Sequence, residues 1–217
     1  MLVINQLRGG GRFGQRFDRY KSIMLSGADS QDTMLSDRRR LGEEIQPMGG
    51  VISWDVAPDD EFFNELYRVS ENQIIWGANY FPNMPPTRCF IVWRKLSISE
   101  TFTMAMAEYA WTSFDGNAKV FEMAPQGKAK DPRYHPTQKP IELYSWILKL
   151  FAKEGDRIFD PMMGSQSSRI AAYMAGYDYY GCELNRAYFD KGNERFDRIC
   201  HGVETINGEL ITQQSLF

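Results

Sequence analysis

The sequence predicts an α/β fold with a mostly parallel sheet and helices on both of its faces. Short apolar runs typical of buried strands alternate along the chain with longer segments whose apolar residues recur at helical spacing. Strands that alternate with helices in this way form a parallel sheet. The chain has 217 residues, of which 43% are hydrophobic and 24% charged, which is enough for one globular domain with its own core.

Composition and charge exclude several classes of protein. No apolar run approaches the roughly 18 residues of a membrane-spanning helix, and the N-terminus lacks the apolar segment of a signal peptide. Three cysteines and two histidines are too few and too scattered for a disulfide framework or a zinc site. A net charge of −3 excludes a uniformly basic surface but allows a local basic patch. We therefore expect an intracellular protein without a metal site.

The first half of the chain opens with a short apolar run, residues 2–5, that we expect to be a strand. The polar stretch that follows, to about residue 50, is expected to be a long mobile loop or a substrate-contacting one. Pro58, the acids after it and apolar residues at helical spacing predict a helix over residues 58–70. Strands are then expected over residues 73–77, 89–95 and 103–114, the last with a helical start as an alternative, and a polar stretch is expected over residues 113–133.

The second half has a more regular pattern. Pro140, Gly155 and the helical spacing between them predict a helix over residues 141–155. The remaining elements are expected as a strand over residues 157–160, a helix over 167–176, a strand over 178–183 and a helix over 185–202. The five tryptophans are expected in the core or at its edge: Trp54, Trp76, Trp93, Trp111 and Trp146.

A strand, an Asp-Pro pair, a glycine turn, a helix and a second strand ending in an acid form the best chemical signal in the chain. In an open parallel sheet, ligands bind beyond the carboxyl ends of the strands. Gly164 lets the backbone approach a ligand, and Glu183, about 20 residues later, suits two ribose hydroxyls. The turn lacks GxGxxG, so an adenosyl ligand without phosphates fits better than a dinucleotide. An ordinary strand–helix turn is the alternative.

Three motifs carry a resemblance to a known family. The segments HPTQKPIELYSWILK, FDPMMGSQSS and GCELNRAYF resemble the β-class amino-methyltransferases of DNA, especially the small phage-type N6-adenine enzymes. Upstream, ELYRVSENQIIWGANYF, PPTRCFIVW and AEYAWTSF are similar to small phage members. The resemblance extends from about Trp54 to Phe196, and HPTQKP is its most specific part.

The resemblance implies a Rossmann-like methyltransferase fold that binds S-adenosyl-L-methionine (AdoMet). We expect one domain over residues 1–217. Its parts would be a diverged N-terminal strand and mobile loop (1–50), a substrate half (51–133), an AdoMet-binding half (134–200) and a tail (201–217). The implied partner is double-stranded DNA, and pairing of two copies is a candidate arrangement. The implied location is the cytoplasm of a bacterium or a phage-infected host, with no membrane association.

The resemblance also implies roles for single residues. The methionine end of AdoMet would be lined by His135, Thr137, Gln138 and Lys139, with Lys139 facing the carboxylate. The floor under the sulfonium would consist of Asp160, Pro161, Gly164 and Ser165, and Glu183 would hold the ribose. The turn departs from the family pattern at Met163 and at Gln166, which replaces the second glycine and removes a permissive backbone position.

The catalytic tetrapeptide of the family, Asp/Asn-Pro-Pro-Tyr/Phe, is absent. Its position should follow the first strand, where Asn5 stands in place of the acid or amide and is the expected catalytic residue. There are two partial matches. NMPP (residues 83–86) lacks the aromatic residue and lies in the loop after IIWGANYF, and DPRY (residues 131–134) adjoins HPTQKP on the wrong side of the sheet order. Asn79, Tyr80 and Phe81 follow a buried strand and are candidate contacts to the flipped base or to AdoMet, with packing as the alternative for the two aromatic rings.

The last residues, QQSLF, resemble the peptide with which bacterial proteins bind the replication sliding clamp. Gln213 would form a hydrogen bond, and Leu216 and Phe217 would be buried in the clamp pocket. A frayed tail, or one folded onto its own core, is the alternative.

The sequence therefore predicts an AdoMet-dependent DNA methyltransferase acting on adenine N6, with a degenerate catalytic motif and a phage or prophage origin. A catalytically inactive or partner-dependent AdoMet- or DNA-binding relative is the second hypothesis. An N4-cytosine methyltransferase is the third, because one fold serves both bases.

Overall fold

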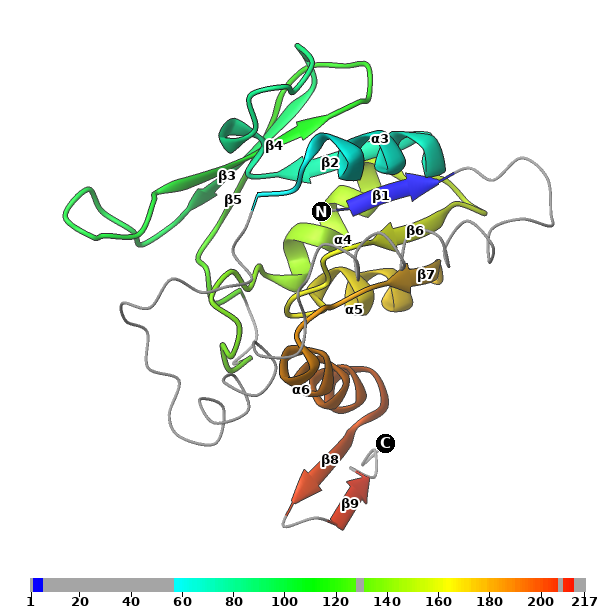
Figure 1. Ribbon diagram of the computed structural model, residues 1–217. Coiled ribbons are helices and arrows are strands. Elements are labelled where there is room, and N and C mark those ends of the chain that lie inside the picture. Colours follow the sequence, from blue (N-terminus) through cyan, green and yellow to red (C-terminus); the bar gives the residue numbers. More distant parts are fainter. Residues whose placement is uncertain (1, 6–56, 128–130, 207–208, 213–217) are drawn as a thin grey trace.

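The structure is a computed structural model that describes residues 2–5, 57–127, 131–206 and 209–212. It combines one main sheet with helices on both faces (Figure 1). Its elements are β1 (Leu2–Asn5), α3 (Asp60–Val69), β2 (Asn72–Trp76), the 3-10 helix η1 (Ala78–Tyr80), β3 (Phe90–Lys95), β4 (Ala107–Thr112), β5 (Lys119–Met123), α4 (Ile141–Phe151), β6 (Arg157–Asp160), α5 (Ser167–Met174), β7 (Asp178–Gly181), α6 (Arg186–Phe196), the π-helical turn η2 (Asp197–His201), β8 (Val203–Ile206) and β9 (Glu209–Thr212).

The main sheet has the strand order β5-β3-β4-β2-β1-β6-β7 in the described part of the chain. β6 and β7 are parallel, β3 and β5 are parallel, and the four other neighbouring pairs are antiparallel. Five strands therefore run in one direction, and only β1 and β4 are reversed. The carboxyl ends of β2, β3, β6 and β7 and the start of β4 all lie at one edge of the sheet, which we call the carboxyl edge.

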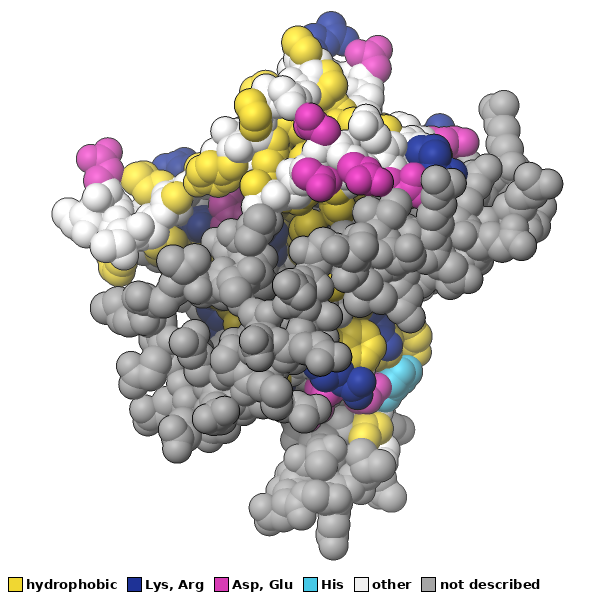
Figure 2. Space-filling view, viewed as in Figure 1, with side chains coloured by type: hydrophobic (Ala, Val, Ile, Leu, Met, Phe, Trp, Pro, Cys, Tyr) yellow, Lys and Arg dark blue, Asp and Glu magenta, His cyan; other side chains and the backbone are white. Residues whose placement is uncertain are grey.

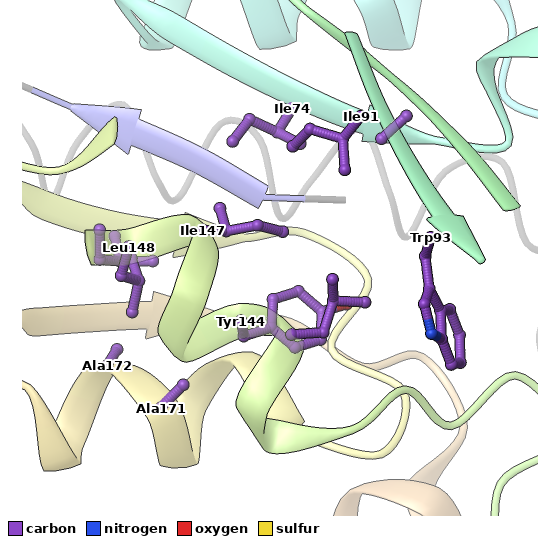
Figure 3. Close-up of a cluster of buried hydrophobic side chains, with 11 residues drawn as sticks. Ile74, Ile91, Trp93, Tyr144, Ile147, Leu148, Ala171 and Ala172 are labelled. Atoms are coloured by element: carbon purple, nitrogen blue, oxygen red, sulfur yellow. The ribbon is translucent and has the colours of Figure 1, made fainter. Parts of the chain in front are cut away.

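One face of the sheet is covered by α4 and α5. Ile74 of β2 and Ile91 of β3 pack towards Ile147 and Leu148 of α4, and Ala171 and Ala172 of α5 complete the cluster (Figure 3). The small alanines allow α5 to lie close against α4. This cluster is the main core, and it fixes the two helices whose N-terminal ends carry the candidate site.

The other face is covered by α3. Ile75, the residue after Ile74 on β2, and Phe159 of β6 point to this face and pack against Phe62 and Leu66 of α3. The alternation between Ile74 and Ile75 is the period of two that a strand imposes on its side chains. Helices therefore cover both faces, as the sequence predicts.

The helix limits follow local capping chemistry. Asp59 caps α3 by accepting a hydrogen bond from the backbone N–H of Phe62 at 2.9 Å. The predicted helix start at Pro58 is thus two residues early. Asn185 caps α6 by accepting from the backbone N–H groups of Ala187 and Tyr188. The helix expected over residues 185–202 continues through α6 into η2.

Two sets of strands depart from the prediction. The expected polar stretch after residue 113 contains β5, whose side chains alternate between half-buried and exposed. The expected tail contains β8 and β9, which pair with each other apart from the main sheet, beyond α6 (Figure 1). Both sets are short strands at a sheet edge or outside the sheet, where the apolar signal is weak.

The tryptophans follow their expected placement where they are described. Trp93 and Trp111 are buried, and Trp76 and Trp146 are half-buried against the main core. Trp54, almost all of the N-terminal loop and the terminal QQSLF peptide lie outside the described residues. None of the helices in the described part of the chain has the length and apolar character needed to cross a bilayer.

The core predicts a large effect of a single truncation in α4. Ile147→Ala should lower the free energy of unfolding by about 2–5 kcal/mol, because Ile147 is fully buried between the sheet and α5. Urea denaturation measures this value. Leu150→Ala on the same helix, where the side chain is 45% exposed, is the matched control and should cost less than about 1 kcal/mol. Equal losses for the two variants would contradict the assigned core.

Candidate active site

The carboxyl edge brings most of the sequence-predicted cofactor residues together. The turn after β6 carries Asp160 and Gly164, and β7 leads directly to Glu183. The loop before α4 contributes His135 and Lys139 to the same edge. Ligands of open α/β sheets bind at such an edge.

Asp160 organises the turn after β6. Its carboxylate accepts hydrogen bonds from the backbone N–H of Met162 at 3.1 Å and from the hydroxyl of Ser168 at 2.6 Å. The side chain is almost completely buried, and Pro161 beside it is also buried. Asp160 therefore shapes the turn on which a ligand would rest.

Glu183 links the turn to the start of α6. Its carboxylate accepts from the backbone N–H of Gly164 at 2.7 Å and from that of Asn185 at 2.9 Å. Burial raises the pKa of the Glu183 carboxyl, although these backbone hydrogen bonds act in the opposite direction. A carboxylate has about four acceptor positions, so these backbone hydrogen bonds leave capacity for a ribose hydroxyl.

His135 is buried directly against the glycine turn. A β-carbon at Gly164 would come within 3.2 Å of the imidazole ring, and Gly164 has a φ of 51°, so both the space and the backbone conformation favour glycine there. The backbone N–H of Thr137 donates to Nδ1 of His135 at 3.2 Å, and the ring packs on Tyr188 with centroids 4.3 Å apart. Burial, with the nearby charges of Lys139 and Arg133, lowers the pKa of His135 to about 4.

The other predicted cofactor residues have structural partners. Gln138 is buried and accepts from the backbone N–H of Tyr134, whereas Thr137 is exposed. Ser165 is buried, and its carbonyl accepts from the Tyr134 hydroxyl at 2.9 Å and from Arg195. Residues 134–139 and the turn after β6 are therefore held together by direct hydrogen bonds.

Lys139 lies in a cluster that the sequence does not indicate. Its ammonium is 2.9 Å from one carboxylate oxygen of Glu108, and the ammonium of Lys95 is 2.7 Å from the other. Lys95 is the last residue of β3, and Glu108 is the second residue of β4. Both side chains therefore lie at the carboxyl edge. Burial alone would raise the pKa of the Glu108 carboxyl, but the charges and hydrogen bonds of Lys139 and Lys95 outweigh burial and lower the pKa below its ordinary value.

Gln166 adopts the conformation for which the family uses glycine. Its φ is 59° and its ψ is 21°, in the left-handed region. The buried side chain spans to α6, where its amide nitrogen donates to the carbonyl of Phe189 at 3.0 Å and its oxygen accepts from Arg169 at 2.7 Å. Only a glycine at position 192 leaves room for it, because a β-carbon there would come within 2.3 Å of the amide. Glutamine at position 166 thus lacks the backbone freedom of glycine, but its side chain provides a contact between the turn and α6.

The two partial matches to the catalytic tetrapeptide are structural. Asp131 of DPRY pairs with Arg195 at 2.5 Å and with Arg198 at 2.9 Å, and so ties this segment to α6. In NMPP, the Asn83 amide donates to Asp60, and the Pro85 carbonyl accepts from the indole N–H of Trp111 at 2.7 Å.

The candidate base contacts separate into two kinds. Asn79 and Tyr80 lie in η1 at the carboxyl end of β2, and Tyr80 is 78% exposed. Phe81 instead packs edge-on against Phe63 of α3 with centroids 5.1 Å apart. The packing alternative therefore describes Phe81 but not Tyr80.

The structure does not bring Asn5 to the site. β1 lies between β2 and β6, as a strand in the tetrapeptide position should, but it runs antiparallel to both. Asn5 is therefore opposite Arg157, the first residue of β6, whereas Asp160 is the last. Three residues of strand correspond to about 10 Å. This corrects the prediction that Asn5 stands at the ligand-binding edge, because an apolar run predicts a strand but not its direction.

Comparison with known proteins identifies the family. The model of a DNA methylase family matches residues 58–194, which is more than half of the chain. This chain belongs to the DNA methylase family. The match covers the carboxyl edge from β2 to β7 together with α3, and it confirms the resemblance seen in the three motifs.

Individual relatives match shorter stretches. The type II methyltransferase M.HpaI of Haemophilus parainfluenzae is 31% identical over 81 residues, which are 37% of this chain and 26% of that protein. The DNA adenine methyltransferase YhdJ of Escherichia coli K12 is 36% identical over 67 residues, which are 31% of this chain and 23% of that protein. The matched parts thus span about a quarter of each relative.

A solved structure supports the fold. The crystal structure of an M1.HpyAVI–SAM complex superposes with a TM-score of 0.52 and 18% sequence identity, over 63% of this chain and 81% of that one. At this identity the likeness is evidence for the fold alone. It confirms the Rossmann-like methyltransferase architecture predicted from the sequence.

His135 predicts a loss of stability in mild acid. The neutral ring is favoured in the folded state, so the pKa falls from about 6.5 unfolded to about 4 folded. The unfolded chain then binds one more proton between these values. The contribution of His135 is therefore fully present above about pH 6.5 and is lost as the pH falls towards 4, by on the order of 3 kcal/mol.

Urea denaturation between pH 7 and pH 4 measures this dependence. His135→Gln should flatten the fall in stability over that window relative to the unaltered protein. His201→Gln, at the exposed second histidine, is the matched control and should retain it. An unchanged pH dependence in His135→Gln would show that the buried imidazole does not control acid stability.

Proposed function

We propose that this chain is an AdoMet-dependent DNA amino-methyltransferase that acts on adenine N6. The observation that supports this proposal best is the joint placement of three motifs at the carboxyl edge. HPTQKP, the Asp160 turn and Glu183 are separated along the chain but contact one another through His135 and Gly164. Membership of the DNA methylase family agrees with this chemistry.

The residues present fit an adenosyl ligand. Glu183 offers carboxylate oxygens to a ribose hydroxyl at the end of β7, and the close contact of Gly164 with His135 marks a turn without a side chain in the way. Asp160 and Pro161 would form the floor, and Ser165 would be fixed by its backbone contacts to Tyr134 and Arg195. When bound, AdoMet supplies an electrophilic methyl group on a sulfonium.

DNA as substrate and adenine as target base belong to the same proposal. The relative YhdJ is named a DNA adenine methyltransferase, which favours adenine over cytosine. The exposed Tyr80 at the end of β2 is suited to stack on an extruded base, with Asn79 beside it. Acidic side chains gather over α3, where Asp59, Asp60 and Glu61 are exposed (Figure 2), so we expect the phosphate backbone to avoid that helix.

A non-catalytic or partner-dependent DNA methylase is the second candidate function. The observation that favours it is the direction of β1, which leaves the tetrapeptide position at the carboxyl edge without Asn5. A partner chain could then supply the missing acceptor. We also propose that two copies of the chain pair, that it has a phage origin and that it is located in the cytoplasm. We propose in addition that it binds the sliding clamp through Gln213, Leu216 and Phe217.

Transfer of labelled methyl from AdoMet to mixed-sequence duplex DNA, followed by digestion to nucleosides, tests the proposed function. We expect label in N6-methyldeoxyadenosine. Label in N4-methyldeoxycytidine would replace adenine by cytosine as the target. AdoMet binding without any transfer would favour the second candidate, and failure to bind AdoMet would overturn the cofactor assignment.

Glu183 predicts a defined loss of cofactor affinity. Glu183→Gln removes a charged acceptor for a ribose hydroxyl and should weaken AdoMet binding by about 10–100-fold, since hydrogen bonds to charged groups contribute about 1.5–3 kcal/mol. Isothermal titration calorimetry measures the dissociation constant. Glu194→Gln, at an exposed position on α6, is the control and should bind as the unaltered protein does. Equal affinities for both variants would argue against ribose recognition by Glu183.

A further inference from the structure

Lys95, Glu108 and Lys139 form a cluster in which two ammonium groups share one carboxylate. The side chains of Lys95 and Lys139 are 8% and 11% exposed, and the Glu108 side chain between them is 29% exposed. Each ammonium also lies 5.2 Å from an indole ring centroid, Lys95 over Trp93 and Lys139 over Trp76. Glu108 is thus the exposed member of an otherwise enclosed group, and it has acceptor positions beyond the two that the lysines use.

The position of the cluster follows from the strand order. Glu108 pairs in register with Trp93 near the start of β4, and Lys95 ends the neighbouring β3. Lys139 belongs to HPTQKP, and its backbone carbonyl accepts from the hydroxyl of Ser167 at the start of α5. The cluster therefore lies at the carboxyl edge, on the side of β2 and β4.

A second link joins Glu108 to the cofactor turn. The buried hydroxyl of Tyr144 is influenced by the charges of both Asp160 and Glu108, which add to burial in raising its pKa. Tyr144 itself is buried in the main core, on α4. The printed contacts join Glu108 to the cofactor side through Lys139, whose ammonium pairs with Glu108 and whose carbonyl accepts from Ser167.

Trp76 supplies an independent indication of a ligand. Its indole Nε1–H is buried and has no hydrogen-bond partner in the described structure. A buried donor without a partner costs about 1–3 kcal/mol, so such a group calls for an explanation, such as a water, an ion or a functional role. Trp76 ends β2, and its ring faces the same Lys139 ammonium that contacts Glu108. A donor and an acceptor are therefore placed around one lysine.

This pairing matches the edge of the target base. Adenine presents an exocyclic amine, which donates, next to a ring nitrogen, which accepts. Given the proposed function, on which this step rests, we propose that Glu108 accepts a hydrogen bond from the exocyclic amine of the flipped adenine while the indole N–H of Trp76 donates to the adjacent ring nitrogen. Glu108 thereby takes the place of the acid or amide of the missing tetrapeptide.

Atoms and electrons balance in the proposed transfer of the methyl group from AdoMet to the adenine amine. The amine nitrogen forms a bond to the methyl carbon with its lone pair, the carbon–sulfur bond breaks, and its electron pair stays on sulfur. The amine becomes cationic as the bond forms, and the negative charge of Glu108 stabilises that charge. The excess proton passes from the methylated nitrogen to Glu108 and then to water.

Glu108→Gln in the full chain is the principal test. The amide keeps the shape of the side chain but removes its charge, so methyl transfer to DNA should fall by about 100-fold or more while AdoMet affinity changes less than about threefold. Glu122→Gln is the matched control, because Glu122 forms an exposed ion pair with Arg94 and should retain full activity.

Each outcome of this test decides the proposal. Full activity in Glu108→Gln would overturn it, as would absence of transfer by the unaltered protein when AdoMet is bound. A loss of AdoMet affinity equal to the loss of transfer would show that the cluster binds the cofactor instead, and would also overturn it. Failure of the unaltered protein to bind AdoMet would refute the proposed function rather than this inference alone.

A second variant guards against a misfolded Glu108→Gln. Trp76→Phe keeps an aromatic ring beneath Lys139 but removes the N–H donor. It should raise the KM for DNA about tenfold with little change in kcat or in AdoMet affinity, since uniform binding to the base is lost. An unchanged KM for DNA would overturn the role of the indole N–H, and a fall in kcat alone would contradict base recognition.

Discussion

The ion pair between Lys139 and Glu108 joins the two parts of the candidate site. Lys139 belongs to the loop that contacts the cofactor turn, and Glu108 belongs to the strands of the substrate half. Because both side chains are largely enclosed, breaking the pair would leave a charge without compensation, which costs several kcal/mol in a protein interior. This ion pair therefore links the loop beside the cofactor turn to β4.

A second set of buried polar contacts holds the cofactor turn to α6. Arg195 is almost completely buried and contacts Asp131, the Ser165 carbonyl and the Ser167 hydroxyl, while Gln166 reaches the Phe189 carbonyl. These contacts let a turn without its second glycine keep a left-handed residue. The strain at Gln166, on the order of 1–2 kcal/mol, is offset by contacts that a glycine would lack.

The sequence predicts the cofactor side of the site well because its signals are local. Asp160, Gly164 and Glu183 follow one strand–helix–strand unit, whose spacing determines that they meet. Glu108 and Lys95 are not predicted, because their contact with Lys139 depends on the order β3-β4-β2 and on pairing between distant segments. The one signal for this cluster in the sequence is Glu108 itself, a charged residue within the otherwise largely apolar strand β4. Asn5 is misplaced for a related reason, since strand direction is set by neighbours that the local pattern does not specify.

A crystal structure of the protein with S-adenosylhomocysteine and an adenine-containing duplex would test most directly whether the carboxyl edge is the active site. The expected result places a ribose hydroxyl within hydrogen-bond distance of Glu183. It also places the amine of a flipped adenine on Glu108, with the lysine contacts of Glu108 intact. A cofactor bound away from the turn after β6, or a base held by other side chains, would contradict it.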